Sequence, residues 1–277
     1  MVAPYSTGPK DAGSHDRAAA AQAAALKALA RLARGDRRAK ILHRLRVQLR
    51  RLQAYLELVG EVENAERVAA CVSRLSDLRT LHVFQAYLRT IRAPGEDRRA
   101  VRARAKALRR KLDRKDVWGR IARRVERHAL PPSPAPADWL ARRFPALRRQ
   151  HAAELAALIA EARADPRRRR LHALRLKVKA LRYQEEWAAG RTKLALRLKE
   201  AQTALGEYEE RAQFRKLARK LGLRSLDRIT MDWRRARDRA RRVPAGLAPV
   251  LDTLAHANVL PFRAADGPSG RRPRPAP

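Results

Sequence analysis

A histidine and two basic residues recur at the same helical spacing in two distant parts of the chain. They are His43, Arg46 and Arg50 in the first part and His172, Arg175 and Lys179 in the second. On a helix, a residue and the residues three and seven positions later lie within about 60° of one another. Each copy therefore predicts one polar row, and the chemistry open to a row of cations beside a histidine is the binding of an anion.

An apolar stripe repeats together with each row. Its members are Leu42, Leu45, Leu49 and Leu52 in the first copy, and Leu171, Leu174, Val178 and Leu181 in the second. A shorter echo follows, in which Leu75-Ser76-Asp77-Leu78 matches Leu205-Gly206-Glu207-Tyr208 at nearly the same spacing. We therefore predict two related helical units, in which the stripe packs into a core and turns the polar row toward the opposite face.

Either row alone is typical of the solvated face of an amphipathic helix, and a single helical histidine is usually structural. The repetition of all three positions favours a functional role, because random basic faces would not reproduce them together. In a protein of two units, the two rows can face one cleft. We expect Arg46, Arg50, Arg175 and Lys179 to point into that cleft, where like charges cost energy until a polyanion neutralises them.

The whole chain is strongly basic. Its 277 residues include 65 Lys and Arg against 28 Asp and Glu, which gives a formal net charge of +37. Self-repulsion of this size favours a polyanionic partner, and nucleic acid, an anionic membrane and polyphosphate all qualify. A compositional bias toward Ala and Arg is the alternative explanation. Aromatic residues make up only 5% of the chain, which ranks phosphate contacts above base stacking.

Cysteine content and hydropathy bound the location of the protein. The single cysteine, Cys71, excludes an internal disulfide framework and fits a small core residue. No apolar run reaches the length of about 18 residues that a membrane span needs, and the first residues lack the apolar core of a signal peptide. We therefore expect a cytoplasmic protein without a membrane partner.

Helical periodicity runs through most of the chain, and no segment alternates at the period of a strand, so we predict an all-α protein. Prolines concentrated at 131–136 cannot continue a helix, because proline lacks the amide donor and clashes with the preceding turn. Gly206 is one of the further predicted breaks. The predicted organisation is a disordered N-terminus at 1–15, one domain at 16–262 made of a helical half at 16–130, a linker at 131–137 and a second half at 138–262, and a disordered basic tail at 263–277.

The repeated segments resemble the motifs of a known family, the conserved histidine α-helical domain, or CHAD. The first is similar to the family pattern H-x-x-R-V-x-x-R-R-L, on His43, Arg46, Val47, Arg50, Arg51 and Leu52. The second is similar to H-x-x-R-x-x-x-K-x-L-R-Y, on His172, Arg175, Lys179, Leu181, Arg182 and Tyr183. The resemblance spans roughly residues 17 to 260 and includes a following helix with Leu198, Gln202, Leu205 and Gly206.

The resemblance implies a fold, a ligand and a set of site residues. The fold is two pseudo-symmetric antiparallel four-helix bundles packed around a basic central groove or pore. The ligand is inorganic polyphosphate, and some members associate with polyphosphate granules. The implied binding residues are His43, Arg46, Arg50, Arg51, His172, Arg175, Lys179 and Arg182. The chain departs from the family at Arg79-Thr80-Leu81-His82, where an Arg-Asp pair is frequent, and at Glu209-Glu210, where an Asn-Asp pair is frequent.

The residues give little support to catalysis. An enzyme acting on polyphosphate needs an activated nucleophile and usually carboxylates that hold Mg²⁺. Acids are sparse, and the nearest clusters are Glu185-Glu186 and Glu207, Glu209 and Glu210. Neither a Gly-rich phosphate loop nor a metal-ligand spacing occurs in the sequence. We expect binding without catalysis, with no cofactor and no metal ion.

Two other functions also fit the charge. Nucleic-acid binding is the first, because counterion release from a phosphate backbone favours binding to any basic surface, although no reading-head motif is present. The second is an adaptor that docks proteins on a polyphosphate granule, with Arg271, Arg272 and Arg274 as accessory contacts. The sequence identifies no protein partner. A cation row inside a narrow cleft favours polyphosphate, with nucleic acid as a competitor, whereas duplex DNA needs a broad exposed face.

Overall fold

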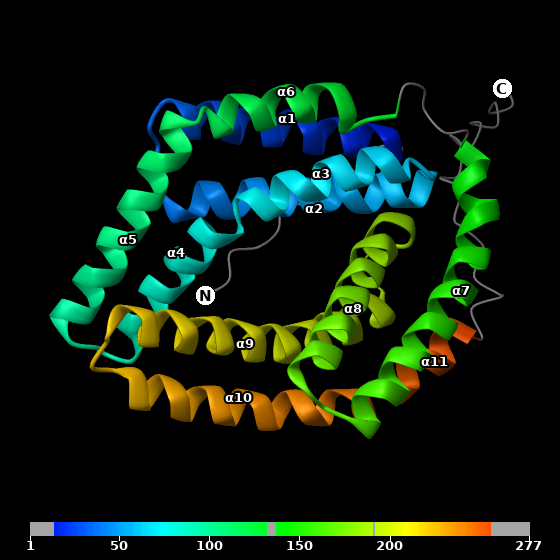
Figure 1. Ribbon diagram of the computed structural model, residues 1–277. Helices are drawn as coiled ribbons and strands as arrows, with labels where there is room; N and C mark the ends of the chain where they lie inside the picture. Colours follow the sequence, from blue (N-terminus) through cyan, green and yellow to red (C-terminus); the bar gives the residue numbers. More distant parts are fainter. Residues whose placement is uncertain (1–13, 132–136, 191, 256–277) are drawn as a thin grey trace, which may run out of the picture.

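A computed structural model describes residues 14–131, 137–190 and 192–255 of the chain (Figure 1). All regular secondary structure in these ranges is helical, which confirms the predicted all-α class. The helices are α1 (Ser14–Ala33), α2 (Ala39–Val59), α3 (Val62–Arg74), α4 (Ser76–Thr90), α5 (Gly95–Arg114), α6 (Val117–His128), α7 (Ala137–Ala164), α8 (Arg168–Ala188), α9 (Lys193–Leu221), α10 (Leu226–Gly246) and α11 (Ala248–Ala255).

The predicted segment boundaries fall partly outside the described residues. Residues 1–13 of the predicted disordered N-terminus, residues 132–136 of the predicted linker and the whole predicted tail at 263–277 lie outside the described residues. Helix α1 begins at Ser14, inside the segment predicted to be disordered, because its helical pattern leads directly into the buried Ala18. The division of the chain at 131–137 lies between the end of α6 and the start of α7, and it stays a prediction.

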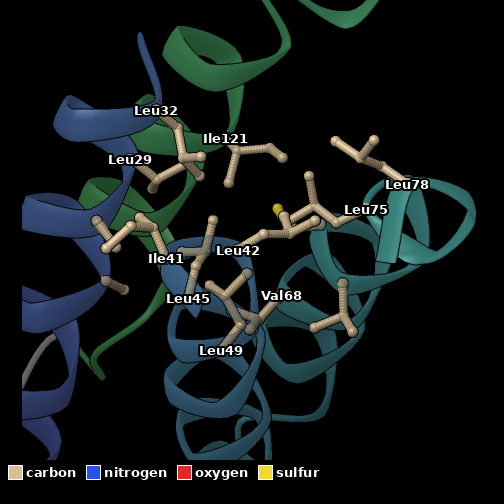
Figure 2. Close-up of a cluster of buried hydrophobic side chains, with 14 of the residues drawn as sticks. Leu29, Leu32, Ile41, Leu42, Leu45, Leu49, Val68, Leu75, Leu78 and Ile121 are labelled. Carbon is tan, nitrogen blue, oxygen red and sulfur yellow. The ribbon is translucent and has the colours of Figure 1, made fainter. Parts of the chain in front are cut away.

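Helix α2 shows how the apolar spacing leads to the fold. The exposed fraction is 0% for each of the stripe residues Leu42, Leu45, Leu49 and Leu52. Figure 2 shows part of this stripe within a cluster that also holds Leu29 and Leu32 of α1, Val68 of α3 and Ile121 of α6. The helix ends at Gly60, whose φ of 87° is the left-handed conformation that glycine adopts without strain. The opposite face of α2 is left for its polar row.

The helices gather into groups that meet through α2, α4, α8 and α9. Helices α1, α2, α3 and α6 pack on one another, and α7 packs on α8, α10 and α11. Helix α9 packs against both α8 and α10, while α4 packs against α5. Contacts of α2 with α8 and of α4 with α9 join these groups (Figure 1). The predicted pseudo-symmetry of two four-helix bundles stays a prediction.

Two buried apolar clusters stabilise the molecule, and the larger one combines residues from both halves of the sequence. The larger cluster combines residues of α1–α6 with Trp187 of α8, Phe214 of α9 and Ile229 of α10. Phe214 stacks on Phe84 of α4, with 4.6 Å between ring centroids. Rings of this size contribute much of the apolar area buried in a core. The late helices therefore complete the core of the early ones, which holds α2 and α8 in a defined relation.

The predicted break at Gly206 is wrong, because this residue lies inside the continuous helix α9. Leu205 and Tyr208 on either side are buried in the second apolar cluster. Their packing outweighs the roughly 1 kcal/mol that a glycine costs in a helix interior relative to alanine. In the part of the chain that the structure describes, no helix has the length and apolarity required to cross a membrane.

Candidate functional site

The two predicted cation rows meet between α2 and α8. These helices contact each other, and the charge of Arg175 on α8 acts on both Arg46 and Arg50 of α2. The charges of Arg50, Arg175 and Arg46 act in turn on Lys179 of α8. Arg46, Arg50, Arg175 and Lys179 are therefore close together, and we call these four residues the basic cluster.

Contacts near the end of α8 hold it against α2. The indole Nε1 of Trp187 donates a hydrogen bond of 2.8 Å to the backbone carbonyl of Arg51. The Trp187 ring also packs against Tyr55, with 5.3 Å between ring centroids. One turn away, the amide of Gln184 donates to a carboxylate oxygen of Glu57 at 3.2 Å. These contacts set the register of the two helices, and with it the approach of the two rows.

Arg46 is tied to the junction between α3 and α4. Its Nη1 donates to the carbonyl oxygen of Val72 at 2.6 Å and to the hydroxyl of Ser76 at 3.0 Å. Val72 lies in the last turn of α3, where free carbonyls and the helix dipole attract a cation. Burial, followed by the charges of Arg50 and Arg79, lowers the pKa of the Arg46 guanidinium to about 10.

Arg50 is oriented by a short polar chain along α2. Its Nη1 donates to Gln53 Oε1 at 2.9 Å, and Gln53 Nε2 donates to Glu57 Oε1 at 2.8 Å. Burial lowers the pKa of Arg50 first of all, the charge of Arg175 adds to this, and Glu57 opposes it. The Nε of Arg50 is buried and has no hydrogen-bond partner among the residues that the structure describes. The Arg50 guanidinium therefore has one nitrogen, Nη1, that is hydrogen-bonded and a buried nitrogen, Nε, that is not.

Lys179 has the most strongly perturbed amine of the basic cluster. The residue is half-buried. Burial, and then the charges of Arg50 and Arg175, lower the pKa of its amine to about 6. Within the described residues Lys179 forms neither a hydrogen bond nor an ion pair. At pH 7 most of these amines are therefore uncharged in the free protein.

Arg175 approaches α9 without finding a partner there. Its Nε is buried and has no hydrogen-bond partner in the described part of the chain. A Cβ added to Gly206 would lie 3.6 Å from this Nε, so the guanidinium passes close to the helix backbone. Glu210 on the same helix interacts electrostatically with Arg175 and Arg79, while burial raises the pKa of its carboxyl. Glu210 is thus an internal counter-charge at the edge of the basic cluster.

Arg79 on α4 is a candidate binding residue that the repeated motifs did not include. Burial lowers the pKa of this half-buried guanidinium, and Glu210 opposes the effect. The charge of Arg79 in turn lowers the pKa values of Arg46 and His43. The available signal was its position one turn after Ser76, in α4, which begins within the echo at 75–78 that follows the first motif. Arg79 extends the positive charge of the cluster onto a third helix.

The two motif histidines lie in different surroundings. His43 is exposed, and its pKa is lowered by partial desolvation and then by the charges of Arg79 and Arg46. The Nδ1 of His172 lies 3.6 Å from a carboxylate oxygen of Glu209. That carboxylate also forms an ion pair with Arg168. His43 therefore borders the basic cluster, whereas His172 faces an acid that is already paired.

Arg182 and Arg51 already engage the protein and lie outside the basic cluster. The buried Arg182 pairs with Glu186 at 3.0 Å and lies over the Tyr183 ring, with its guanidinium carbon 4.1 Å from the ring centroid. Its charge still lowers the pKa of Lys179. Arg51 is half-buried and contributes its backbone carbonyl to the bond from Trp187. Arg51 thus takes part in the contact between α2 and α8, whereas the contacts of Arg182 lie within α8.

The acidic clusters of the sequence are engaged by arginines. Glu185 is 1% exposed and pairs with Arg148 of α7 at 2.6 Å, between an oxygen and Nε. The other pairs are Glu186 with Arg182, Glu207 with Arg239 and Arg211, and Glu209 with Arg168. Over the described residues, no group of three His, Cys, Asp or Glu side chains is arranged to hold a metal ion.

A surface hollow of about 420 Å³ lies beside the start of α8, where Glu161, Arg169, Arg170 and Ala173 line it. None of the predicted site residues lines this hollow. The basic central groove or pore therefore stays a prediction, and the candidate site is defined by the converging side chains.

The CHAD domain family model matches residues 17–219, which is more than half of the chain. The matched range contains both repeated segments and all four residues of the basic cluster. No curated protein and no solved structure matches the chain.

Proposed function

The chain belongs to the CHAD domain family, which is associated in general with polyphosphate binding, and we propose that it binds inorganic polyphosphate at the basic cluster without catalysis. One observation carries this proposal. Two rows that are far apart in the sequence bring Arg46, Arg50, Arg175 and Lys179 together between α2 and α8, although their charges disfavour one another.

A phosphate chain relieves the energetic cost of this arrangement. Like charges removed from water destabilise the folded state unless an opposite charge accompanies them. Arginine offers a planar fork of donors to phosphate oxygens, and lysine offers a compact charge. The Nε atoms of Arg50 and Arg175 supply donors that find no partner among the described residues. Binding would therefore satisfy donors and neutralise charge in one step.

In the cell, the same binding would attach the protein to polyphosphate granules. A protein that holds one segment of a long polyphosphate chain stays attached to the particle that contains the chain. The chemistry needs no cofactor and no metal ion in the protein, and the protein acts as a cytoplasmic binding module. Nucleic acid enters as a competitor, because it offers the same phosphate charge on a wider and stiffer backbone.

Competition between the two polyanions tests the proposal. Purified protein is titrated with long-chain polyphosphate in about 0.15 M salt, the ionic strength at which exposed charges are screened beyond about 8 Å, with duplex DNA at equal phosphate concentration. We expect polyphosphate to displace DNA and its chain length to stay unchanged on incubation with Mg²⁺. Retention of DNA at equal phosphate concentration would refute the polyphosphate assignment, and shortening of the chain would refute the absence of catalysis.

A matched pair of substitutions separates the cluster from diffuse charge. Arg50→Gln removes a charge-assisted contact, and such a contact is worth roughly 1.5–3 kcal/mol, or about one to two decades of affinity. Arg102→Gln removes one exposed charge from α5 and controls for the change in net charge. Equal losses of affinity in the two variants would show that binding is a diffuse charge effect.

A further inference from the structure

A second set of arginines lies on α9 and α10, and none of them belongs to the basic cluster. Arg234, Arg237 and Arg241 on α10 are three and seven positions apart, so they share one face of the helix within about 60°. Arg215 and Arg219 are one turn apart on α9, which packs against α10. We call these five residues the arginine strip. Figure 1 shows α10 at the outer edge of the molecule, beside α9.

Trp233 of α10 joins the two parts of the arginine strip. The guanidinium carbon of Arg215 lies 4.3 Å from the centroid of the Trp233 ring, and that of Arg237 lies 5.4 Å from it. The ring of Tyr208 on α9 stacks on Trp233, with 6.5 Å between centroids. Guanidinium groups that stack on an aromatic ring are preorganised, and their N–H donors can still bind phosphate oxygens. The contact therefore brings arginines of two helices together in a form that suits an anion.

Carboxylates leave most of the arginine strip without a counter-charge. Within the described residues Arg237 is the one member that forms an ion pair, with Asp238 at 3.0 Å. The acids Asp232 and Glu207 are engaged by arginines outside the strip, namely Arg228, Arg235, Arg211 and Arg239. The buried Nε of Arg215 has no hydrogen-bond partner in the part of the chain that the structure describes. The strip thus has positive charge and donors that a polyanion can satisfy.

Helix α9 separates the arginine strip from the basic cluster. Arg175 of the basic cluster approaches this helix at Gly206. Arg215 is nine positions further along, or about two and a half turns, so it leaves the helix on the opposite side. The helix with its side chains is about 10–12 Å wide. A phosphate chain that contacts both sets of cations must therefore pass round α9.

We propose that the arginine strip is a second binding surface for polyphosphate, which a long chain occupies at the same time as the basic cluster. The inference rests on the proposed function, since the cluster supplies the other contact. Once one segment of the chain is bound, its next segments stay near the second surface at a high effective concentration. Two linked contacts of this kind can exceed either single affinity by about 10²–10⁴-fold. The protein would therefore prefer long chains to short ones.

The aromatic residues of the strip favour a bare phosphate chain over nucleic acid. Single-stranded nucleic acid uses aromatic side chains as platforms on which its bases stack. Here Arg215 and Arg237 lie over the Trp233 ring. Tyr208 is buried and stacks on the same ring. The strip therefore offers guanidinium donors for phosphate oxygens without a platform for bases.

A comparison of chain lengths tests the proposal. Tripolyphosphate is too short to pass round a helix about 10–12 Å wide, whereas long-chain polyphosphate can do so. An Arg234→Gln, Arg241→Gln double variant removes two exposed charges that form neither a hydrogen bond nor an ion pair with the described residues. By calorimetric titration in about 0.15 M salt, we expect this variant to lose at least about tenfold in affinity for the long chain and less than about twofold for tripolyphosphate.

An Arg102→Gln, Arg110→Gln double variant on α5 is the matched control, because both arginines are exposed and the net charge changes equally. It should lose less than about threefold in affinity for the long chain, since exposed charges are screened beyond about 8 Å in this salt. Equal losses of long-chain affinity in the two double variants would overturn the proposal. A strip variant that loses affinity for tripolyphosphate and for the long chain by the same factor would also overturn it.

Arginine labelling of the wild-type chain adds a measurement that does not depend on any variant. Phenylglyoxal modifies accessible arginines, and peptide mass mapping follows the reaction at each position. Long-chain polyphosphate should prevent most of the labelling of Arg234 and Arg241 and leave Arg102 reactive. Tripolyphosphate that saturates the basic cluster should leave all three reactive. Full reactivity of Arg234 and Arg241 in the presence of saturating long-chain polyphosphate contradicts the proposal.

Arg50→Gln distinguishes failure of this inference from failure of the proposed function. If Arg50→Gln weakens the binding of both phosphate chains and the strip variant binds like the wild type, the basic cluster is the site and the second surface is refuted. If the strip variant alone weakens long-chain binding, the strip is a polyphosphate surface and the basic cluster is not. Strip substitutions that weaken the binding of duplex DNA and leave polyphosphate binding unchanged would make the strip a nucleic-acid surface and overturn the proposal.

Discussion

The rows of α2 and α8 share one sequence pattern, yet the protein holds them differently. Arg46 donates to Ser76, the second residue of the echo that follows the first motif. Arg175 occupies the matching position in the second motif, and Gly206 is the matching residue of its echo. Glycine has no hydroxyl, and within the described ranges the Arg175 Nε beside it has no hydrogen-bond partner.

The difference indicates a division of roles within the site. The α2 arginines are positioned by hydrogen bonds to Val72, Ser76 and Gln53. These bonds offset part of the free-energy cost of burying the two charges in the free protein. Among the described residues Lys179 has no such bond, and the buried Nε of Arg175 lacks one, as does the Nε of Arg50. We infer that α2 contributes a preformed half-site, whereas α8 contributes the groups that gain most when a polyanion arrives.

Substitution of one residue from each row tests this comparison most strongly. Both Arg46→Gln and Lys179→Met should lower polyphosphate affinity about 10–100-fold. Arg46→Gln should also lower the free energy of unfolding by about 1 kcal/mol, because the bonds to Val72 and Ser76 are lost. Lys179→Met should raise that free energy by about 1–2 kcal/mol at pH 7, because it removes a desolvated amine from among like charges. Urea unfolding and calorimetric titration measure the two effects.

The pH dependence of stability provides the control. The unfolded amine keeps its proton up to a pH of about 10.4, whereas the folded amine, with its pKa of about 6, loses it much earlier. Between these values the unfolded state binds more protons, so the destabilisation by Lys179 declines as pH rises. The gain from Lys179→Met should therefore shrink toward pH 10. A loss of stability in both variants at pH 7 would mean that the two rows are held alike.

Proton uptake on binding is the next largest expected effect. A bound polyanion stabilises the ammonium form of Lys179 and so raises its pKa from about 6. Binding then takes up to one proton per site between pH 6 and 8, and affinity should rise as pH falls, by up to about tenfold per unit. Titration calorimetry in buffers of different ionisation enthalpy measures the uptake.

The lysine and the histidine contributions to this uptake can be separated. His43 also has a lowered pKa and can add to the uptake. Lys179→Met should remove most of the pH dependence above pH 7, whereas a His43→Gln, His172→Gln double variant should leave most of it. A pH dependence that survives Lys179→Met and vanishes in the histidine double variant would assign the proton to the histidines.

The sequence was sufficient to predict the all-α class and the apolar side chains of α2 that share one face. Periodicity determines these features locally, and the leucine stripe of α2 is buried as its spacing required. The approach of Arg50 to Lys179 followed from repetition together with the expectation that two units face each other. The predicted break at Gly206 failed, because tertiary packing on both sides of the residue keeps α9 continuous.

The parts of the site that sequence did not reveal depend on contacts between distant helices. Arg79 belongs to no repeated motif, and it acts on the cluster because α4 packs against both α2 and α9. Phe214 completes a core that lies mostly in the first half of the chain. His172 fits the motif, but its neighbour Glu209 comes from a separate helix. Such neighbours depend on helix packing, which the periodicity of one segment does not specify.

The smallest expected effect comes from restoring the missing hydroxyl, and it tests the cause of the difference directly. The Cβ position of Gly206 lies at ordinary contact distance from the Arg175 Nε, so Gly206→Ser can be accommodated and its hydroxyl can accept from that Nε. The variant should gain about 0.5 kcal/mol from helix propensity and about 1 kcal/mol from the hydrogen bond.

Gly206→Ala is the matched control, because it restores the side-chain carbon without the hydroxyl. Alanine is the better helix former by about 0.5 kcal/mol, so without a hydrogen bond the alanine variant would be the more stable of the two. We expect the serine variant to equal or exceed it in urea unfolding, and this advantage to disappear in an Arg175→Gln background, where the donor is absent. If Gly206→Ser stays below Gly206→Ala in both backgrounds, the glycine is not what leaves Arg175 unpartnered, and the contrast between the rows has another cause.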